Sequence, residues 1–238
     1  MLENEDFNRS ISLAGDQKYS DNAVDNLCSY LRHGSHEELL AAIRLLGSLR
    51  PTSALQPLLD VLEECEHSLR PNEAELGLPG SAGHGLAIIG EICDSLARYD
   101  CDKSHKTLLR LINSSGNQWV RFTALRATGF ESNWHDEHLV RRYLKQKRST
   151  KLRVAALWAI HETSGYRLDG YKALVLPLLA DGSPSVIIAA VDVLALFIHR
   201  DNAIMTAFEP LLADNRFCNI SKATVAHYVS SYFELTVE

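Results

Sequence analysis

The segment Val120-Arg121-Phe122-Thr123-Ala124-Leu125 recurs three more times along the chain. The other copies are Leu152-Arg153-Val154-Ala155-Ala156-Leu157, Val186-Ile187-Ile188-Ala189-Ala190-Val191 and Ile220-Ser221-Lys222-Ala223-Thr224-Val225. Successive copies start 32, 34 and 34 residues apart. A spacing of this size is typical of repeat proteins, and small residues between bulky apolar ones let neighbouring helices approach closely. The segment therefore predicts one helix per repeat in a stack of helices.

A second helix is expected before each of these copies. Three segments with an internal proline occupy that position, at 54–59, 174–179 and 207–212, and two upstream copies of the repeated segment lie at 39–43 and 85–89. Because proline removes a helical hydrogen bond, we expect a bend at Pro57, Pro177 and Pro210. The chain then divides into six helix pairs, at about 22–49, 53–98, 103–130, 136–164, 170–199 and 203–233.

The connections between paired helices carry residues that end and start helices. Asp181-Gly182-Ser183-Pro184-Ser185 places a glycine after one helix, and a serine cap followed by proline at the start of the next. Segments 113–117 and 148–150 have a similar composition. Sustained alternation of apolar and polar residues is missing, so the sequence predicts helices and no strands.

These features together resemble the HEAT-repeat superfamily, especially its short bacterial form named after phycobilisome lyases. The resemblance rests on the three prolines, the 181–185 turn, and helices that open with Val120-Arg121 and Leu152-Arg153. It implies a right-handed all-α solenoid of about six HEAT-like helical pairs, with the second helices lining the concave face. Ile187 and Ser221 replace the arginine of the family pattern, so the subfamily is not identifiable.

Length and composition are compatible with one domain. The chain has 238 residues, of which 46% are hydrophobic, which suffices for a continuous core. We expect an acidic tail or cap at 1–20 and a single solenoid domain at 21–238, with an insertion loop at 65–83. The sequence shows no signal peptide and no apolar run of membrane-spanning length. Its five cysteines are widely spread, and together these features predict a cytoplasmic protein.

Charge is unevenly distributed along the chain. Residues 1–80 carry a net charge of −8, whereas residues 101–153 carry +8, within a total of −6. Seven of the thirteen residues at 141–153 are basic. Segregated charge of this kind attracts a partner of opposite charge. The segment therefore predicts a contact with an acidic protein surface, although a solvated helix face offset by acidic flanks explains it equally well.

The predicted partner-binding residues lie in and near this basic segment. They are Arg121, Arg126, Trp134, Arg141, Arg142, Lys145, Lys147, Arg148 and Lys151. The remaining acidic surface argues against nucleic acid as the partner, because it would repel a long polyanion. The acidic N-terminal region is an alternative contact site, for a basic partner. The sequence leaves the oligomeric state undetermined.

No sequence motif for phosphate binding, nucleophilic catalysis or metalloprotease chemistry is present. His135 and His138 have the spacing of a shared helix face. Cys93, Cys101 and His105 span a helix, a turn and the next helix. Neither set has the ligands of a zinc site. We therefore predict neither cofactor nor metal, and a non-enzymatic adaptor, assembly factor or inhibitor, such as a toxin-neutralising immunity protein. The alternatives are enzyme-type HEAT proteins: a bilin-lyase-like subunit, or a DNA-alkylation glycosylase with tryptophans in a basic cleft.

Overall fold

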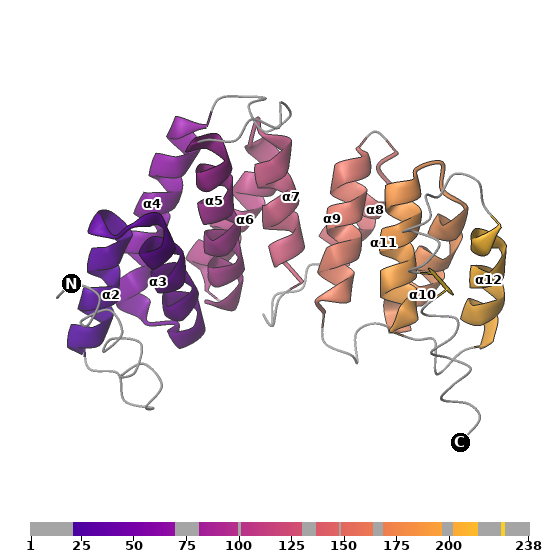
Figure 1. Ribbon diagram of the computed structural model, residues 1–238, viewed down its shortest axis with the longest axis horizontal. Coiled ribbons are helices and arrows are strands. Elements are labelled where there is room, and N and C mark those ends of the chain that lie inside the picture. The colour runs from indigo at the N-terminus through magenta and orange to yellow at the C-terminus, as the bar shows by residue number, and fades with distance from the viewer. Residues whose placement is uncertain are drawn as a thin grey trace, which may run out of the picture. The chain divides into compact units, whose positions relative to one another are not determined.

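The computed structural model describes most of the repeat region (Figure 1). The described residues are 21–69, 81–99, 101–129, 137–147, 149–163, 169–196, 202–213 and 225–226. The chain divides into two compact units, Met1–Trp134 and His135–Glu238. A single domain over 21–238 stays a prediction, and each unit is described by itself below.

The first unit consists of helix pairs. Its elements are α2 (Asp21–His33), α3 (His36–Leu49), the short 3-10 helix η1 (Thr52–Ala54), α4 (Leu55–Ser68), α5 (Ser81–Arg98), α6 (Asp102–Ser114) and α7 (Gln118–Ala127). Helices α3, α5 and α7 pack against one another in sequence, and each also packs against the helix that precedes it. The three are the predicted second helices of their pairs, so they form one layer of a stack.

The second unit repeats this arrangement. Its elements are α8 (Glu137–Leu144), α9 (Thr150–His161), α10 (Asp169–Val175), the 3-10 helix η4 (Leu176–Ala180), α11 (Pro184–Ala195) and α12 (Asn202–Leu212). Helix α9 packs against both α8 and α11, and α11 packs against η4. No strand occurs in the part of the chain that the structure describes. The predicted all-α solenoid of helix pairs is confirmed.

Small residues in the second helices are buried, as the repeat pattern predicts. Ala42, Ala124, Ala156 and Ala190 are fully inaccessible to solvent. The tightest approach is between α3 and α5 at Gly47, where a Cβ atom would lie 2.4 Å from Ser95 Oγ. The Ser95 hydroxyl donates a hydrogen bond to the Ile43 carbonyl, at 3.0 Å. Helices α3 and α5 are therefore in contact through backbone and small side chains.

The predicted caps are present, with one difference. The Asn117 side chain accepts hydrogen bonds from the Trp119 and Val120 amides, and the Ser149 hydroxyl accepts one from Leu152. Ser183 occupies the N-cap of α11 with Pro184 following, but its side chain makes no cap hydrogen bond. Asp181 instead accepts a hydrogen bond from the Ser183 amide, at 2.9 Å.

The three prolines that were predicted to bend helices occupy different positions. Pro57 lies in the first turn of α4, where its missing N–H disrupts little because the first amides of a helix lack intrahelical partners. At Pro177 the α-helix has already ended, and the chain continues as the 3-10 helix η4. Pro210 lies beyond the first turn of the α-helix α12, close to its end at Leu212.

The predicted insertion at 65–83 is helical at both ends. Helix α4 continues to Ser68 and α5 begins at Ser81, so residues 65–68 and 81–83 belong to helices. Residues 70–80 and the predicted N-terminal segment 1–20 lie outside the described residues. In the described part of the chain, no helix is both long enough and apolar enough to cross a membrane.

Candidate protein-interaction surfaces

Five of the nine predicted binding residues lie on the α8–α9 hairpin of the second unit, and four of them form a cluster. Arg142 is exposed on α8, Lys145 and Lys147 are exposed in the turn that follows, and Lys151 is partly exposed in the first turn of α9. The guanidinium of Arg142 lies 4.9 Å from the centre of the Tyr143 ring. Lys145 and Lys147 form no ion pair within the described residues. We call these four residues the α8–α9 basic cluster.

Arg141 belongs to the same helix but is already paired. Its Nε donates a hydrogen bond to Glu137 Oε1 at 2.6 Å, and a second guanidinium nitrogen reaches the Gly170 carbonyl at 3.2 Å. The guanidinium also lies 5.7 Å from the centre of the Tyr171 ring. Arg141 therefore connects α8 to α10, which leaves it less available to a partner than its neighbours.

Arg153, the last basic residue of the segment, is part of the core. Its side chain is 7% exposed and forms an ion pair with Asp181, which is 15% exposed. Burial opposes ionisation of Asp181, but hydrogen bonds from Arg153 and from the Ser183 amide hold the pKa of this carboxyl below its ordinary value. This pair joins α9 to the turn that precedes α11.

Arg121 and Arg126 lie on α7 in the first unit, and both have structural partners. Arg121 Nε donates to the Ile112 carbonyl at 2.8 Å, which ties α7 to α6. Arg126 forms an ion pair with Asp94 on α5, at 2.5 Å. Trp134 and Arg148 lie outside the described residues. The described members of the predicted set are therefore divided between the two units.

The second helices of the first unit are joined by charged side chains. Arg44 on α3 pairs with Glu91 on α5 at 2.5 Å, and Asp94 on α5 pairs with Arg126 on α7. Burial raises the pKa of Asp94 to about 6, and Arg126 opposes that rise. Trp119, at the start of α7, is 37% exposed and packs edge-on against Phe122.

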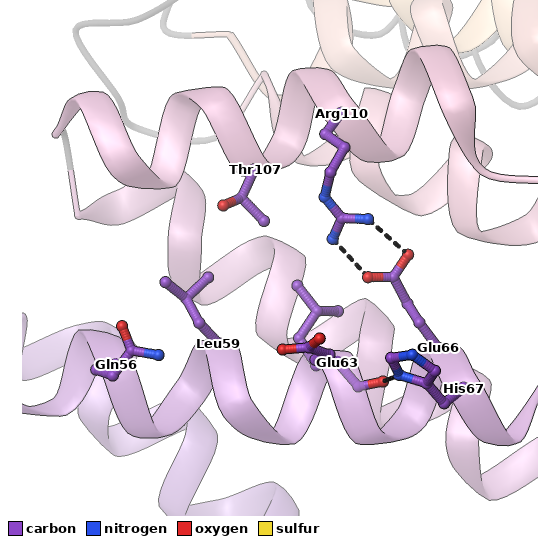
Figure 2. Close-up of a pocket in the computed structure, with 8 residues that line it drawn as sticks. Gln56, Leu59, Glu63, Glu66, His67, Thr107 and Arg110 are labelled. Atoms are coloured by element: carbon purple, nitrogen blue, oxygen red, sulfur yellow. Dashed lines mark hydrogen bonds and ion pairs between the residues drawn. The ribbon is translucent and has the colours of Figure 1, made fainter.

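A groove between α4 and α6 was not predicted from the sequence. Figure 2 shows Arg110 of α6 and Glu66 of α4 reaching towards each other across it. Two hollows of about 600 and 270 Å³ adjoin at these two residues and together make up the groove. We call it the α4–α6 groove; its lining residues are Gln56, Leu59, Leu62, Glu63, Glu66, His67, Leu69, Thr107, Arg110, Ser114, Ser115, Gly116, Asn117 and Val120.

The sequence did contain a signal for this surface. Asp60, Glu63, Glu64 and His67 line a shallower hollow along the side of α4, and they are spaced three or four residues apart. Such spacing places acidic side chains on one face of a helix. The repeat pattern defines this helix by its apolar residues and does not reflect its charged face.

The residues considered for metal binding do not form a site in the described structure. Cys93 is fully buried, and burial raises the pKa of its thiol. Within the described ranges, no group of three or more histidine, cysteine, aspartate or glutamate side chains is arranged to hold a metal ion. His135 lies outside those ranges, so the predicted pair with His138 is not described.

Comparison with known proteins finds similarity only among solved structures. No protein-family model matches the chain, and no curated protein matches its sequence. An engineered protein solved by the Northeast Structural Genomics Consortium is 14% identical, with 89% of this chain and 96% of that chain covered at a TM-score of 0.47. A designed armadillo repeat protein is 16% identical, with coverage of 87% and 98% and a TM-score of 0.46.

A third similar structure is of computationally designed armadillo repeat proteins for modular peptide recognition. It is 16% identical, covers 87% of this chain and 98% of its own, and has a TM-score of 0.47. The assignment of an all-α solenoid rests on the packing of the helix pairs themselves.

Proposed function

We propose that this protein is a non-enzymatic HEAT-type solenoid that binds another protein and acts as an adaptor, an assembly factor or an inhibitor. The α8–α9 basic cluster is the contact site in this proposal, and the partner presents an acidic surface. A toxin-neutralising immunity protein is one specific form of the inhibitor role; it predicts that a neighbouring gene encodes the toxin.

The observation that carries the proposal is the exposure of Lys145 and Lys147 together. The acid that lies near Lys147 is already engaged, since Asp181 pairs with Arg153. Lys147 lies near enough to Asp181 to help lower its pKa, so the two lysines concentrate positive charge around one turn. Clustered charge of one sign accelerates association with a surface of opposite charge.

A protein partner fits this cluster better than a nucleic acid does. The chain has a net charge of −6, and the described surface of α4 is acidic. A long polyanion contacting the hairpin would be repelled by the rest of the molecule. A folded protein with a local acidic patch avoids this repulsion because it contacts a smaller area.

Affinity purification of the tagged protein from its native cell tests the proposal. We expect a stoichiometric protein partner, identified by mass spectrometry, whose binding is lost when Arg142, Lys145 and Lys147 are all replaced by glutamate. The matched control replaces three exposed basic residues of the first unit, Arg32, Lys103 and Lys106, by glutamate. Both variants change the net charge equally, but only the first alters the α8–α9 basic cluster.

Two results would overturn the proposal. One is a partner that binds the hairpin variant as tightly as the wild type, because the cluster would then be the wrong site. The other is tight, salt-sensitive binding of duplex DNA by the purified wild type, which would favour the glycosylase alternative.

A further inference from the structure

The second helices of the two units differ at a repeat position that is partly exposed. Arg126 on α7, Trp158 on α9 and Asp192 on α11 occupy this same position. In the first unit, Arg126 forms an ion pair with Asp94 of the neighbouring helix. In the second unit, Trp158 packs edge-on against the ring of His161 on its own helix, with ring centres 5.3 Å apart. An aromatic side chain on α9 therefore takes the place of a paired charge.

Further apolar side chains lie on the same face of α9 and α11. Val154 and Trp158 are one turn apart on α9, and Ile188 and Leu196 are two turns apart on α11. Leu196 is 43% exposed, and the other three are partly exposed. Helices α9 and α11 lie side by side and pack against each other (Figure 1). These four residues make up what we call the α9–α11 apolar face.

Charge differs between the two ends of this face. Lys147 and Lys151 lie at the start of α9, within the α8–α9 basic cluster. Glu162 is partly exposed at the other end, one turn beyond Trp158. Asp192 lies level with Trp158, because the two residues share a repeat position on neighbouring helices. A partner is therefore favoured when its acids meet the lysine end and its bases meet the end with Glu162.

An α-helix is the partner element that fits this combination of charge and shape. The helix dipole favours acidic side chains in the first turn of a helix and basic ones in the last turn, which is the order required beside α9. Two packed helices leave a groove between their rows of side chains, into which a row from a third helix fits. Helix α9 has 12 residues and is about 18 Å long at the helical rise, so a partner helix of about three turns spans the face.

We propose that the α9–α11 apolar face binds an amphipathic helix of the partner protein, which lies parallel to α9. Its acidic first turn meets Lys147 and Lys151, its apolar side chains cover Val154 and Trp158, and its basic last turn meets Glu162. This inference rests on the proposed function, because the α8–α9 basic cluster forms one end of the site. A tryptophan that becomes buried in an interface contributes a large share of the binding energy.

Fluorescence anisotropy tests the proposal with a labelled synthetic helical peptide about four turns long. The peptide carries glutamates in its first turn, leucines three and four residues apart along one face, lysines in its last turn, and alanine elsewhere to favour the helix. We expect saturable binding to the full-length protein. A second peptide, in which the glutamates and lysines are exchanged, should bind at least tenfold more weakly because like charges then meet at both ends.

Variants of the protein locate the binding site. Trp158→Ala should weaken binding at least tenfold, whereas the matched control Trp119→Ala, which removes the 37% exposed tryptophan of the first unit, should leave affinity within twofold of the wild type. Leu196→Ser changes an exposed side chain and should weaken binding at least threefold. Glu162→Lys should weaken binding of the original peptide and strengthen binding of a peptide whose last-turn lysines are replaced by glutamates. Loss of folding would not produce this exchange of preference.

Several results would overturn the proposal. Absence of saturable binding, or equal affinity for the peptide with exchanged charges, would mean that the face does not bind a helix in this orientation. Unchanged affinity in Trp158→Ala and Glu162→Lys, together with lost binding in the hairpin variant, would overturn this inference and leave the basic cluster as the contact site of the proposed function. Full binding by the hairpin variant would overturn both.

Discussion

Arg121 and Arg153 occupy the same position of the repeat, one in each unit, and have different roles. Arg121 bonds back to a carbonyl at the end of the preceding helix, whereas Arg153 pairs with a carboxylate of the following repeat. The difference follows from the residue two positions before the N-cap of each second helix. This residue is Ser115 before α7, Lys147 before α9 and Asp181 before α11, so only the last supplies an acid. The position in the repeat determines where the arginine side chain lies, whereas the residue opposite it determines whether the arginine forms a hydrogen bond or an ion pair.

The two units also differ in how their second helices are joined. In the first unit, one exposed and one partly buried ion pair connect α3, α5 and α7. In the second, α9 and α11 are each mostly buried, and the Arg153–Asp181 pair lies beside their core. Removing one partner of a buried ion pair destabilises a protein more than removing one partner of an exposed pair. The reason is that the remaining charge is left buried without a partner. Variants of these ion pairs and of the α3–α5 contact test this difference.

The largest effect is expected from Arg153→Leu. This variant leaves Asp181 nearly buried without its guanidinium partner and should lower the free energy of unfolding by about 3 kcal/mol. The control Arg121→Leu loses one hydrogen bond to a backbone carbonyl and should cost only about 1 kcal/mol. Urea denaturation at neutral pH measures both. Equal losses would show that the two arginines contribute alike, against the comparison above.

The same variant has a predicted pH dependence. Because the folded state lowers the pKa of Asp181, its contribution is present above the unfolded pKa of about 3.9 and is lost as the pH falls through the folded pKa. The difference in stability between wild type and Arg153→Leu should therefore shrink below about pH 4. A difference that stays constant across this range would rule out the carboxylate as the partner that matters.

The next effect concerns the close approach within the first unit. Gly47→Ala places a Cβ 2.4 Å from Ser95 Oγ and 2.9 Å from Ser95 Cα, so α3 and α5 must separate. We expect a loss of about 2 kcal/mol. Gly90→Ala is the control, since its nearest neighbour would be Thr123 Cγ2 at an ordinary 3.8 Å. Alanine favours helix, so this control should gain about 0.5 kcal/mol. Thermal melts compare the two variants.

A smaller, pH-dependent effect is expected for Arg126→Leu. Burial raises the pKa of Asp94 to about 6, so the folded state favours the protonated carboxyl, and that contribution is lost as the pH rises through 6. Without Arg126 the ionised carboxylate has no guanidinium beside it. The variant should lose about 1.5 kcal/mol at pH 8 and clearly less at pH 5, where Asp94 takes up a proton. Equal losses at both pH values would contradict this account.

The smallest effect is expected for Arg44→Ala. The Arg44 side chain is 62% exposed, so its pair with Glu91 should contribute about 0.5 kcal/mol. Because exposed pairs are screened by salt, the difference from wild type should vanish in about 1 M sodium chloride. A loss as large as that of Arg153→Leu would mean that exposed and buried pairs stabilise the two units equally.

Most of the fold was predictable because the apolar pattern has a fixed period. Positions such as Ala124, Leu157 and Val191 are buried wherever the repeat predicts a core position, since helix stacking leaves only one face for them. The proline bends were less predictable. Whether Pro57 bends a helix depends on where that helix begins, and helix ends are set by caps and tertiary contacts.

The predicted binding residues were harder to judge from the sequence. The count of basic residues at 141–153 identified a charged segment, but it did not distinguish Lys145, which is exposed, from Arg153, which is buried. Both have the same charge in the sequence. Their difference arises from an aspartate 28 residues further along the chain.

The sequence by itself determined that this protein is a stack of helix pairs, and that its charge is divided between an acidic first part and a basic middle. Only the tertiary structure decided which charges are already neutralised within the protein and which face solvent. It also brought α4 and α6 together around a groove that ends at Asn117. The physical reason is that periodicity reflects burial along one helix, whereas ion pairs and grooves are formed by residues that are distant in the sequence.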